Sequence, residues 1–409
     1  MNQIKLGILR EGKVPPDKRV PLTPKQCKLV EAKFPNVKVK VQTSPIRSFK
    51  DEDYLAEGIE VVESIADCDV ILGVKEVNIE DLIPGKKFMF FSHTIKKQPY
   101  NRNLLRAIME KKIQLIDYEV LKNRQNKRII GFGRYAGIVG AYNGFLTFGM
   151  KKGLYELKPA NLCADRADME SELSKVVLPK DTKIVLTGFG RVGYGAREIM
   201  DLLPITEVTP EEFLNDSFDQ PVFTHLEVED YYTRKDGAAF EKSDFYANPS
   251  SYKSSFFRYA EKAQMYIACH FWSNKSPFII TREDFKQATN KIEVVADVSC
   301  DIDGPIGCTI RPSKIADPVY GYDPNTESEA DWKKEGVVAV MAVDNLPCEL
   351  PQDASEDFGN ELIKQVFPHL FGEDLDDVIG RASETDLNGN LTPLFSYLQD
   401  YVDGTTVNQ

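Results

Sequence analysis

A glycine-rich turn joins an apolar run to a helix-like segment near the middle of the chain. The apolar residues 184–186 lead into Gly188-Phe189-Gly190-Arg191-Val192-Gly193, and the small, charged and aliphatic residues that follow are typical of a helix. In such a strand–turn–helix unit, the first glycine permits a tight turn, the second lets backbone approach a pyrophosphate, and the third lets the helix pack on the strand. Glycine-rich turns also occur without a ligand, but this context favours a dinucleotide site. Its expected cofactor-binding residues are Gly188, Gly190, Arg191, Val192 and Gly193.

The size and charge of the chain limit the classes of protein to which it can belong. At 409 residues the chain exceeds a usual single domain, so two domains are expected. The composition, with 42% hydrophobic and 28% charged residues, is that of an ordinary globular protein. The net charge of -12 would repel a nucleic-acid backbone or an anionic membrane surface, so we expect neither as a partner.

The cysteine pattern and the amino terminus bear on the compartment. The 7 cysteines are odd in number and contain no CxxC pair, which indicates reduced thiols and neither a disulfide framework nor a zinc site. We therefore expect no metal. The amino-terminal residues 1–12 lack the apolar core of a signal peptide, and no apolar run approaches the ~18 residues of a membrane span. These features favour a cytoplasmic location.

Strand-like and helix-like segments alternate over the first 130 or so residues. Nearly continuous apolar runs are typical of strands that are covered on both faces, as in a parallel sheet flanked by helices. The pattern therefore predicts an α/β domain. The strand-like runs are residues 4–11, 37–43, 69–76, 86–94 and 113–119, and helix-like segments occupy residues 24–34 and 101–112.

The second half of the chain continues this pattern with one interruption. Residues 131–154 are rich in small and aromatic residues and predict a buried helix. The stretch 215–260 is irregular and predicts helical insertions. Further strands are expected at 263–272, 291–299 and 336–347. A helix near the end of the chain places four apolar residues on one face, namely Phe358, Leu362, Ile363 and Val366.

Several strand-like runs of the first domain end in polar residues that could carry chemistry. Lys75 with Glu76, His93 and Glu119 would all emerge at one edge if the strands are parallel. An amine, an imidazole and carboxylates beside a nicotinamide fit oxidation at a carbon that bears nitrogen or oxygen. Lysine serves as a base only if burial or nearby positive charge lowers its pKa. The alternatives are a solvated strand end for Lys75 and Glu76 and a core position for His93.

An arginine near the first strand is a second kind of candidate. Arg19 lies in the loop segment DKRVPLTP and could clamp a substrate carboxylate through two hydrogen bonds. The alternative is an ordinary surface arginine. His225, His270 and His369 have no spacing that indicates a metal site.

The motifs together resemble those of the alanine dehydrogenase and saccharopine dehydrogenase superfamily. Within it, the chain is most similar to lysine-forming saccharopine dehydrogenases and to the lysine–2-oxoglutarate reductase domain of the bifunctional lysine-degrading enzyme. The matching segments run nearly end to end in the order of the family. They are residues 18–24, 69–76, 90–98, 115–119, 131–137, 187–196, 294–306 and 342–359.

The resemblance implies an α/β fold with two Rossmann-like domains, parallel sheets flanked by helices, and an active site in the interdomain cleft. Residues 1–132 and 345–409 would form the substrate domain, and residues 133–344 would bind the dinucleotide. Lys75 and His93 would occupy the acid–base positions, Arg19 would bind a substrate carboxylate, and Glu76 and Glu119 would tune the lysine and the pocket. Asp344 and Leu346 would lie near the nicotinamide.

The resemblance also implies a reaction, the NAD(P)-linked interconversion of saccharopine with L-lysine and 2-oxoglutarate through an imine. Arg134 stands where related sequences have an uncharged residue, close to the expected position of the amino-acid substrate. This departure leaves open an alanine- or opine-type dehydrogenase. A catalytically idle dinucleotide-binding protein is a third possibility. The sequence leaves the oligomeric state open.

The cofactor is expected to be NAD or NADP, with a slight lean to NAD. Glu207, Glu211 and Glu212 follow the expected second strand of the dinucleotide domain. The last two lie 18 and 19 residues after Gly193. This is near the offset of about 20 residues at which an acid holds the ribose hydroxyls. A carboxylate at that position would repel a 2′-phosphate.

Overall fold

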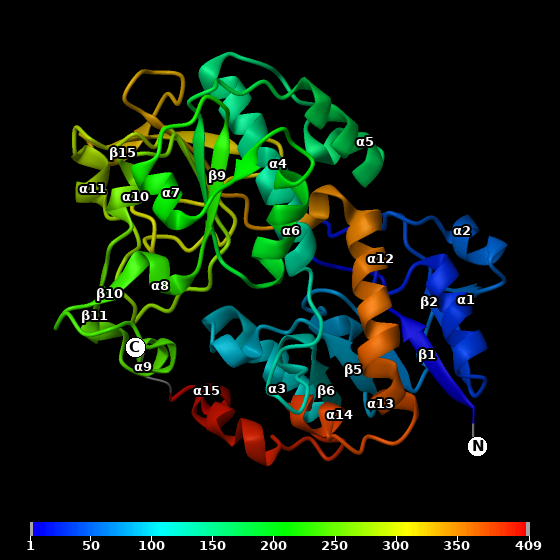
Figure 1. The fold of residues 1–409 in the computed structure, drawn as a ribbon. Helices are drawn as coiled ribbons and strands as arrows, with labels where there is room; N and C mark the ends of the chain where they lie inside the picture. The colour runs from blue at the N-terminus through cyan, green and yellow to red at the C-terminus, as the bar shows by residue number, and fades with distance from the viewer. Residues whose placement is uncertain (1–2, 406–409) are drawn as a thin grey trace. The chain divides into compact units, whose positions relative to one another are not determined.

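The computed structural model of the protein describes residues 3–405, which form two compact units. One unit combines the residues up to Phe132 with those from Pro351 onward, and the other runs from Gly133 to Leu350 (Figure 1). Residues 1–2 and 406–409, which belong to the expected first domain, lie outside the described part. None of the helices within residues 3–405 is long and apolar enough to span a membrane.

The first unit is built on a sheet of six strands that all run parallel. Five of the strands lie within runs predicted as strands, and these predictions are confirmed. The three-residue edge strand β3 was not predicted. In spatial order the strands are β3 (Glu60–Val62), β2 (Val37–Gln42), β1 (Ile4–Ile8), β4 (Val70–Leu72), β5 (Lys87–Phe90) and β6 (Gln114–Asp117).

Strand β4 is shorter than the apolar run that predicted it. Glu11 accepts the backbone N–H of Val74 at 2.7 Å and that of Lys75 at 3.0 Å, so a side chain takes the place of a neighbouring strand. The strand ends at Leu72 on this account, although Gly73 and Val74 still hydrogen-bond to Met89 and Phe91 on the other side. Lys75 and Glu76 leave the sheet at its carboxyl edge as a consequence.

Helices cover both faces of this sheet. On one face, Val30 of α1 and Phe358 of α12 belong to the same buried cluster as strand residues such as Leu6. On the other face, Leu104 of α3 packs with Phe88 of β5. The helices are α1 (Pro24–Lys33), α2 (Asp51–Ala56), α3 (Arg102–Glu110), α12 (Pro351–Glu361), α13 (Phe367–Phe371), α14 (Val378–Ala382) and α15 (Gln399–Asp403).

The apolar face predicted near the end of the chain is confirmed. Phe358, Leu362 and Val366 are fully buried, and Ile363 is nearly so. A wider π-helical turn, Leu362–Val366, joins α12 to α13, so this stretch is one continuous helical run with an irregular centre.

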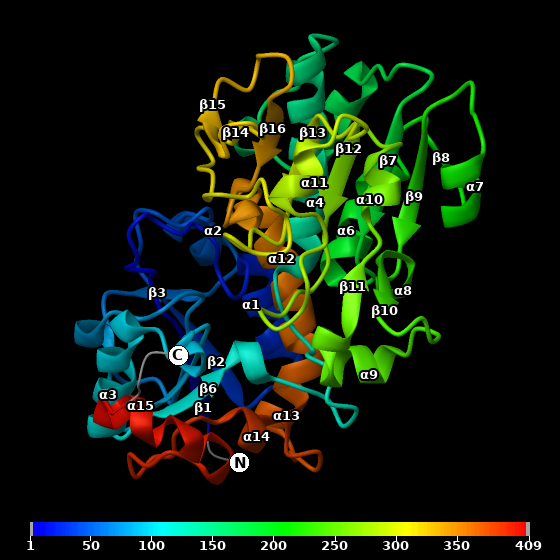
Figure 2. The same cartoon turned by 90° about the vertical axis from the view of Figure 1, so that its left-hand side faces the viewer.

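The second unit contains a sheet of eight strands, six of which run parallel (Figure 2). The predicted α/β fold is confirmed, and the second sheet adds an antiparallel edge, where β14 pairs antiparallel with both β16 and β15. The short turn between Asp323 and Ser328 returns the chain at once, and such a turn can only connect antiparallel strands. In spatial order the strands are β15 (Ser328–Ala330), β14 (Val319–Asp323), β16 (Val338–Met341), β13 (Val294–Asp297), β12 (Met265–Ala268), β7 (Lys183–Thr187), β9 (Val222–Leu226) and β8 (Thr206–Glu207).

The irregular stretch 215–260 contains strands as well as the expected helices. It includes β9, which pairs with β7, and a separate antiparallel pair formed by β10 (Tyr232–Arg234) and β11 (Tyr252–Ser254). The helices of the second unit are α4 (Gly133–Lys152), α5 (Arg166–Glu172), α6 (Arg191–Met200), α7 (Pro210–Asn215), α8 (Val228–Tyr231), α9 (Lys242–Ala247), α10 (Phe257–Ala260) and α11 (Arg282–Lys286).

Helix α4 is the buried helix predicted at residues 131–154, and it lies against α6 (Figure 1). A Cβ added at Gly137 would lie 1.8 Å from the carbonyl oxygen of Val192. A Cβ added at Gly195 would lie 2.0 Å from the carbonyl oxygen of Arg134. The backbones of the two helices therefore touch only because both positions lack a side chain.

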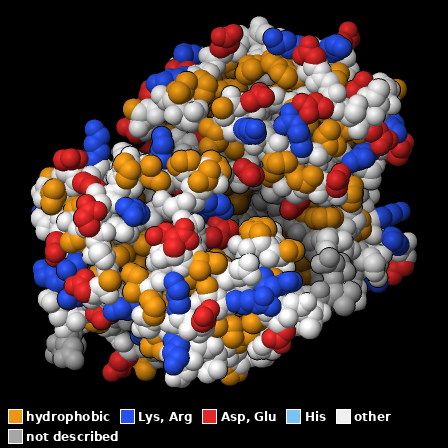
Figure 3. Space-filling model, turned by 180° about the vertical axis from the view of Figure 1, so that it is seen from behind, with side chains coloured by type: hydrophobic (Ala, Val, Ile, Leu, Met, Phe, Trp, Pro, Cys, Tyr) orange, Lys and Arg blue, Asp and Glu red, His pale blue; other side chains and the backbone are white. Residues whose placement is uncertain are grey.

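Charged side chains of both signs are interspersed over the surface, as the face in Figure 3 shows. Many of them pair, such as Arg197 with Glu207 and Arg311 with Glu329, each at 2.6 Å. Exposed pairs of this kind contribute only about 0–1 kcal/mol each. The stability of both units therefore depends mainly on their buried clusters.

Replacing Gly137 with alanine should destabilise the second unit by about 1–3 kcal/mol, because the added methyl group forces α4 away from α6. Urea unfolding followed by circular dichroism would measure this. Gly190→Ala is the matched control, since a Cβ there would meet nothing within 4 Å. Equal stability of the two variants would contradict the close packing of α4 on α6.

Candidate functional site

Two of the expected site residues, Glu76 and His93, meet at the carboxyl edge of the first sheet. Glu76 follows β4 and His93 follows β5, and these neighbouring strands are parallel. Oε1 of Glu76 lies 2.6 Å from Nδ1 of His93, and Nζ of Lys13 donates to Oε2 of Glu76 at 2.7 Å. One carboxylate therefore binds both an imidazole and an ammonium group.

The Glu76 carboxylate determines the tautomer of His93. Burial would raise the pKa of Glu76, but hydrogen bonds from His93 and Lys13 outweigh burial and lower this pKa to about 2. An ionised carboxylate only accepts hydrogen bonds, so in the neutral imidazole Nδ1 carries the hydrogen and Nε2 offers its lone pair. His93 can therefore accept a proton at Nε2.

Lys75 precedes Glu76 and has the electrostatic surroundings that a basic amine requires. Burial lowers the pKa of Lys75, and the positive charges of Arg19 and Lys13 lower it further. The carboxylates of Asp17 and Glu76 act in the opposite direction and are weaker. A lysine with a lowered pKa releases its proton closer to neutral pH and can exchange protons with a substrate.

Arg19 is buried, with 2% of its surface exposed, so the alternative of a surface arginine is wrong. Its Nε donates to Asp17 at 3.0 Å and its Nη2 at 2.6 Å, and its guanidinium stacks 4.2 Å from the centre of the Phe132 ring. Burial would raise the pKa of Asp17, but Arg19 outweighs burial and lowers it. Arg19 is thus held rigidly beside Lys75, and its binding of a substrate carboxylate stays a prediction.

Glu119 and Arg134, the other two expected substrate-binding residues, each have an ion-pair partner. Glu119 follows β6 at the same edge of the first sheet, where its Oε1 binds Lys96 Nζ at 3.1 Å. Arg134 belongs to the second unit and forms a two-point ion pair with Glu198, at 2.7 and 2.9 Å. The structure therefore places Arg134 against α6, where its charge is already paired.

Four polar residues of this region escaped the sequence analysis, namely Glu11, Lys13, Asp17 and Arg128. Glu11 is buried, and burial raises its pKa to about 7 despite two backbone hydrogen bonds. Arg128 stacks 5.5 Å from the centre of the ring of Phe91, and Phe91 comes two residues before His93 in the sequence. No local pattern of the sequence singles these four residues out from the polar residues of ordinary loops.

The glycine turn of the second unit has the geometry of a phosphate cradle. Gly188 has φ of +100°, and a Cβ there would lie 2.4 Å from the carbonyl oxygen of Cys269. A Cβ at Gly193 would lie 1.8 Å from the carbonyl oxygen of Gly188, whereas Gly190 faces open space. The amino terminus of α6 follows at Arg191, so its free N–H groups point to the turn. These residues fit a dinucleotide pyrophosphate.

A buried histidine supports this turn from behind. His225 Nε2–H donates to the carbonyl oxygen of Gly188 at 2.7 Å, and its ring stacks on Phe189 with centroids 3.7 Å apart. Burial lowers the pKa of His225 and so favours its neutral form. We infer that His225 is structural and holds the turn in shape.

A pocket of about 440 Å³ lies beside the turn, and its lining contains Glu227 but none of Glu207, Glu211 and Glu212. Its lining includes Gly188, Arg191 and Glu227. Glu227 directly follows β9, the strand that pairs with β7. Glu207 instead ends the two-residue edge strand β8 and pairs with Arg197, at 2.6 and 2.7 Å.

Glu207 ends the next strand along the chain, as expected, but this strand pairs with β9 and not with β7, and Glu211 and Glu212 follow it in α7. Glu211 lies in the exposed helix α7, and Glu212 binds the N-cap residue Thr209. Residues 204–220 contain β8 and α7 and come before β9. The strand that lies next to β7 in the sheet is therefore later in the sequence than expected. The alternation in VFTHLE, residues 222–227, was the available signal.

The two residues expected near the nicotinamide differ in exposure. Asp344 is exposed beyond β16, whereas Leu346 is 2% exposed and contacts α4, where a Cβ on Gly140 would lie 3.1 Å from its Cδ1. Leu346 therefore packs against the long helix, and its contact with a cofactor stays a prediction.

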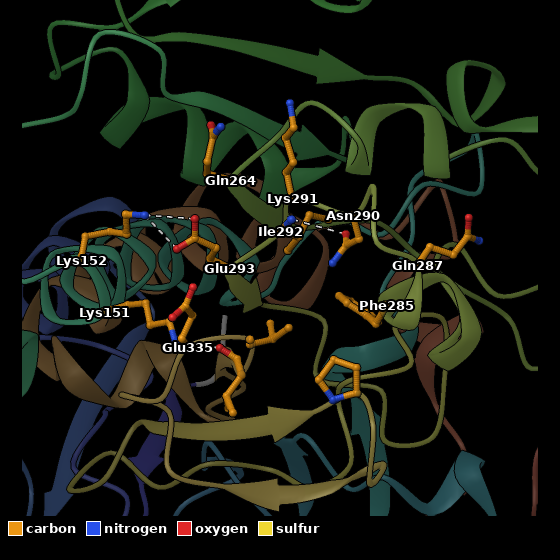
Figure 4. Close-up of a pocket in the computed structure, with 14 residues that line it drawn as sticks. Lys151, Lys152, Gln264, Phe285, Gln287, Asn290, Lys291, Ile292, Glu293 and Glu335 are labelled. Carbon is orange, nitrogen blue, oxygen red and sulfur yellow. Dashed lines mark hydrogen bonds and ion pairs between the residues drawn. The ribbon is translucent and has the colours of Figure 1, made fainter.

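A larger pocket of about 600 Å³ lies at the opposite, amino edge of the second sheet (Figure 4). Lys151 donates to the carbonyl oxygens of Trp332, Lys334 and Val337, and Lys152 pairs with Glu293. These two cations already have partners. Ligands of parallel sheets bind at the carboxyl edge, where the glycine turn lies, so we assign no ligand to this pocket.

Comparison with known proteins agrees with these features. Residues 7–139 match the family described as alanine dehydrogenase/PNT, N-terminal domain. The alpha-aminoadipic semialdehyde synthase of Arabidopsis thaliana is 29% identical over 438 residues, which cover 96% of this chain and 41% of the relative. The chain thus spans less than half the length of that relative. A saccharopine dehydrogenase (NAD(+), L-lysine-forming) of Yarrowia lipolytica is 25% identical and covers 89% of this chain and 91% of the relative.

Among solved structures, an L-alanine dehydrogenase has the same fold. It superposes with a TM-score of 0.64 over 98% of this chain and all of its own, at 17% identity. The fold and the sequence relatives together confirm the predicted resemblance to the oxidoreductase superfamily that contains alanine and saccharopine dehydrogenases.

The buried Glu11 should make stability fall as the pH rises through neutrality. Its pKa is about 7 in the folded protein and about 4.3 in an unfolded chain, so the folded state binds more protons between these values. Its contribution is complete below the lower value and is lost above the higher one. Glu11→Gln should remove up to about 1.4 kcal/mol per pH unit from this slope. Urea unfolding between pH 4 and 8 measures it, with the exposed Glu373→Gln as control.

Proposed function

We propose that this chain, which resembles alanine and saccharopine dehydrogenases, is an NAD(P)-dependent oxidoreductase that interconverts saccharopine with L-lysine and 2-oxoglutarate. One observation carries the proposal: the imidazole of His93 bound to Glu76 at the same strand edge as Lys75, an amine with a lowered pKa. The similarity to saccharopine dehydrogenases over most of the chain supports the choice of substrate.

In this proposal the chain supplies the proton transfers. Lys75 removes a proton from the secondary amine as the C–N bond is oxidised, and His93 exchanges a proton through Nε2 as water adds to the resulting imine. Glu76 orients His93, and Arg19 binds a carboxylate of the substrate. The dinucleotide, when bound, supplies the hydride acceptor or donor.

The cofactor would be held by the second unit. Gly188, Gly190 and Gly193 let the backbone approach the pyrophosphate, with Arg191 and Val192 at the amino terminus of the helix. Glu227 would bind the ribose hydroxyls, and Asp344 and Leu346 would lie near the nicotinamide. A carboxylate at Glu227 favours NAD, although Lys242 lies 3.3 Å away and reduces its repulsion of a 2′-phosphate.

Loss of the two acid–base groups should abolish turnover without unfolding the protein. Purified protein with saccharopine and NAD or NADP should produce absorbance at 340 nm. Lys75→Met combined with His93→Gln should reduce the rate at least about a hundredfold, since each general acid–base group contributes about 10²–10⁴. Lys38→Met, on the exposed side of β2, is the matched control and should leave the rate unchanged.

The same assay separates the proposal from its alternatives. Turnover of alanine or of other amino acids paired with 2-oxo acids, and none of saccharopine, would favour an alanine- or opine-type enzyme. Arg134, which motivated that alternative, pairs with Glu198 and lends it no further support. Tight dinucleotide binding with no turnover of any candidate would indicate an idle cofactor-binding protein.

The assignment of the ribose acid predicts a contrast between two glutamates. Glu227→Ala should weaken NAD binding about tenfold to a hundredfold, because hydrogen bonds to a charged group contribute about 1.5–3 kcal/mol. Glu207→Ala should change NAD binding by less than about twofold, because Glu207 pairs with Arg197 away from the pocket. Isothermal titration calorimetry measures both. The reverse order would place the ribose at β8.

A further inference from the structure

Two buried carboxyl groups lie directly behind His93. Asp117 ends β6, and Glu384 comes from the part of the chain that returns to the first unit after Pro351. Between them lie Ser92 and Thr94, the two neighbours of His93 in the sequence. All four side chains are fully buried.

These four side chains form one chain of hydrogen bonds. The Ser92 hydroxyl contacts Oδ2 of Asp117, and its oxygen lies 2.6 Å from Oγ1 of Thr94. Oγ1 of Thr94 lies 2.5 Å from Oε2 of Glu384. The order in which these side chains are hydrogen-bonded is therefore Asp117, Ser92, Thr94 and Glu384.

A count of hydrogens shows that this row of four hydrogen-bonded side chains needs one proton more than its two hydroxyl groups supply. Each of the three short O···O contacts requires a hydrogen between its oxygens. Ser92 and Thr94 bring one hydroxyl hydrogen each. The third hydrogen must therefore belong to a carboxyl group, which means that one of the two acids is neutral.

The remaining contacts decide which acid is neutral. Asp117 also accepts the backbone N–H of Ser92 at 3.2 Å and that of Glu119 at 2.6 Å, and such donors stabilise a carboxylate. Glu384 meets the hydroxyl groups of Ser92 and Thr94 and the carboxyl group of Asp117, and none of these three is a backbone N–H. Burial, and secondly the charge of Asp117, raise the pKa of Glu384 well above its usual range. The proton therefore belongs to Glu384, which donates to Thr94, then Thr94 to Ser92, and Ser92 to Asp117.

We propose that Asp117 and Glu384 are positioning residues that share one buried proton through Ser92 and Thr94 and thereby hold His93 and Glu119 in place. This inference rests on the proposed function for the catalytic role of His93. The backbone of His93 has φ of 54°, in the left-handed region that non-glycine residues rarely adopt. Hydrogen bonds on both of its neighbours keep this residue in that conformation. Asp117 likewise binds the backbone of Glu119.

Other ionisable groups near the pair need to be considered in any titration. Glu119 interacts with Asp117, and Tyr397 and Tyr401 approach from the carboxy-terminal segment. Burial raises the pKa of Tyr401 to about 12 and raises that of Tyr397, so neither tyrosine loses its proton near neutral pH.

The location of the proton predicts opposite outcomes for two conservative variants. Glu384→Gln keeps a neutral group whose N–H can donate to Thr94, so it should retain turnover within about threefold. Glu384→Ala removes the donor and should lose about tenfold or more in kcat. Asp117→Asn turns an N–H donor toward the backbone N–H of Ser92 or Glu119. It should lose about tenfold to a hundredfold in kcat, with a smaller change in KM.

Two further measurements do not depend on activity. The infrared spectrum of the wild type minus that of Glu384→Gln should show the C=O stretch of one protonated carboxylic acid. Glu11, whose pKa is about 7, contributes equally to both proteins and cancels in this difference. Because the Glu384 pKa is raised on folding, its contribution to stability is present at low pH and is lost as the pH rises through the raised pKa. The alkaline loss of thermal stability should therefore be smaller in Glu384→Gln than in the wild type.

These outcomes separate the inference from the proposed function. If the wild type turns over no substrate but the infrared band and the pH slope behave as expected, the function is wrong and the proton-sharing cluster stands without a catalytic role. If Asp117→Asn is as mild as Glu384→Gln, or if Glu384→Gln is as damaging as Glu384→Ala, the location of the proton is wrong. A wild-type minus Glu384→Gln infrared spectrum that lacks the carboxylic-acid band would also overturn it.

Discussion

Parallel pairing of neighbouring strands is the constraint on which both halves of this protein depend. Parallel strands deliver all their carboxyl ends to one edge, whatever their separation in the sequence. In the first unit this rule brings Glu76, His93 and Glu119 to the ends of β4, β5 and β6. In the second unit it places the glycine turn after β7 next to Glu227 after β9.

Three buried glutamates of the first unit differ in pKa because their hydrogen-bond donors differ. Glu76 binds an imidazole and an ammonium group and stays ionised, with a pKa of about 2. Glu11 receives two backbone N–H groups and has a pKa of about 7. Glu384 meets two hydroxyl groups and the carboxyl group of Asp117, and burial and the charge of Asp117 raise its pKa well above the usual range. The number and charge of the donors, and not burial alone, decide which acids carry a proton.

The second unit depends on the absence of side chains where backbones approach each other. Gly137 and Gly195 let α4 and α6 touch, and Gly188 and Gly193 let the turn fold tightly over the start of α6. The amino terminus of α6, over which the turn folds, also provides the N–H groups of the phosphate cradle. Packing and binding therefore impose the same requirement on this stretch of sequence.

The sequence by itself determined the features that depend on near neighbours. These are the strand-like runs, the buried helix at 131–154, the glycine turn and the polar residues at the strand ends, because periodicity and turn chemistry act over a few residues. Only the tertiary structure decided which distant groups meet. It placed Glu384 against Ser92, 292 residues away. It also put β9 between β7 and β8, so that Glu227, and not Glu207, lies beside the turn. Strand order and the pairing of buried charges depend on long-range packing, for which local periodicity carries no signal.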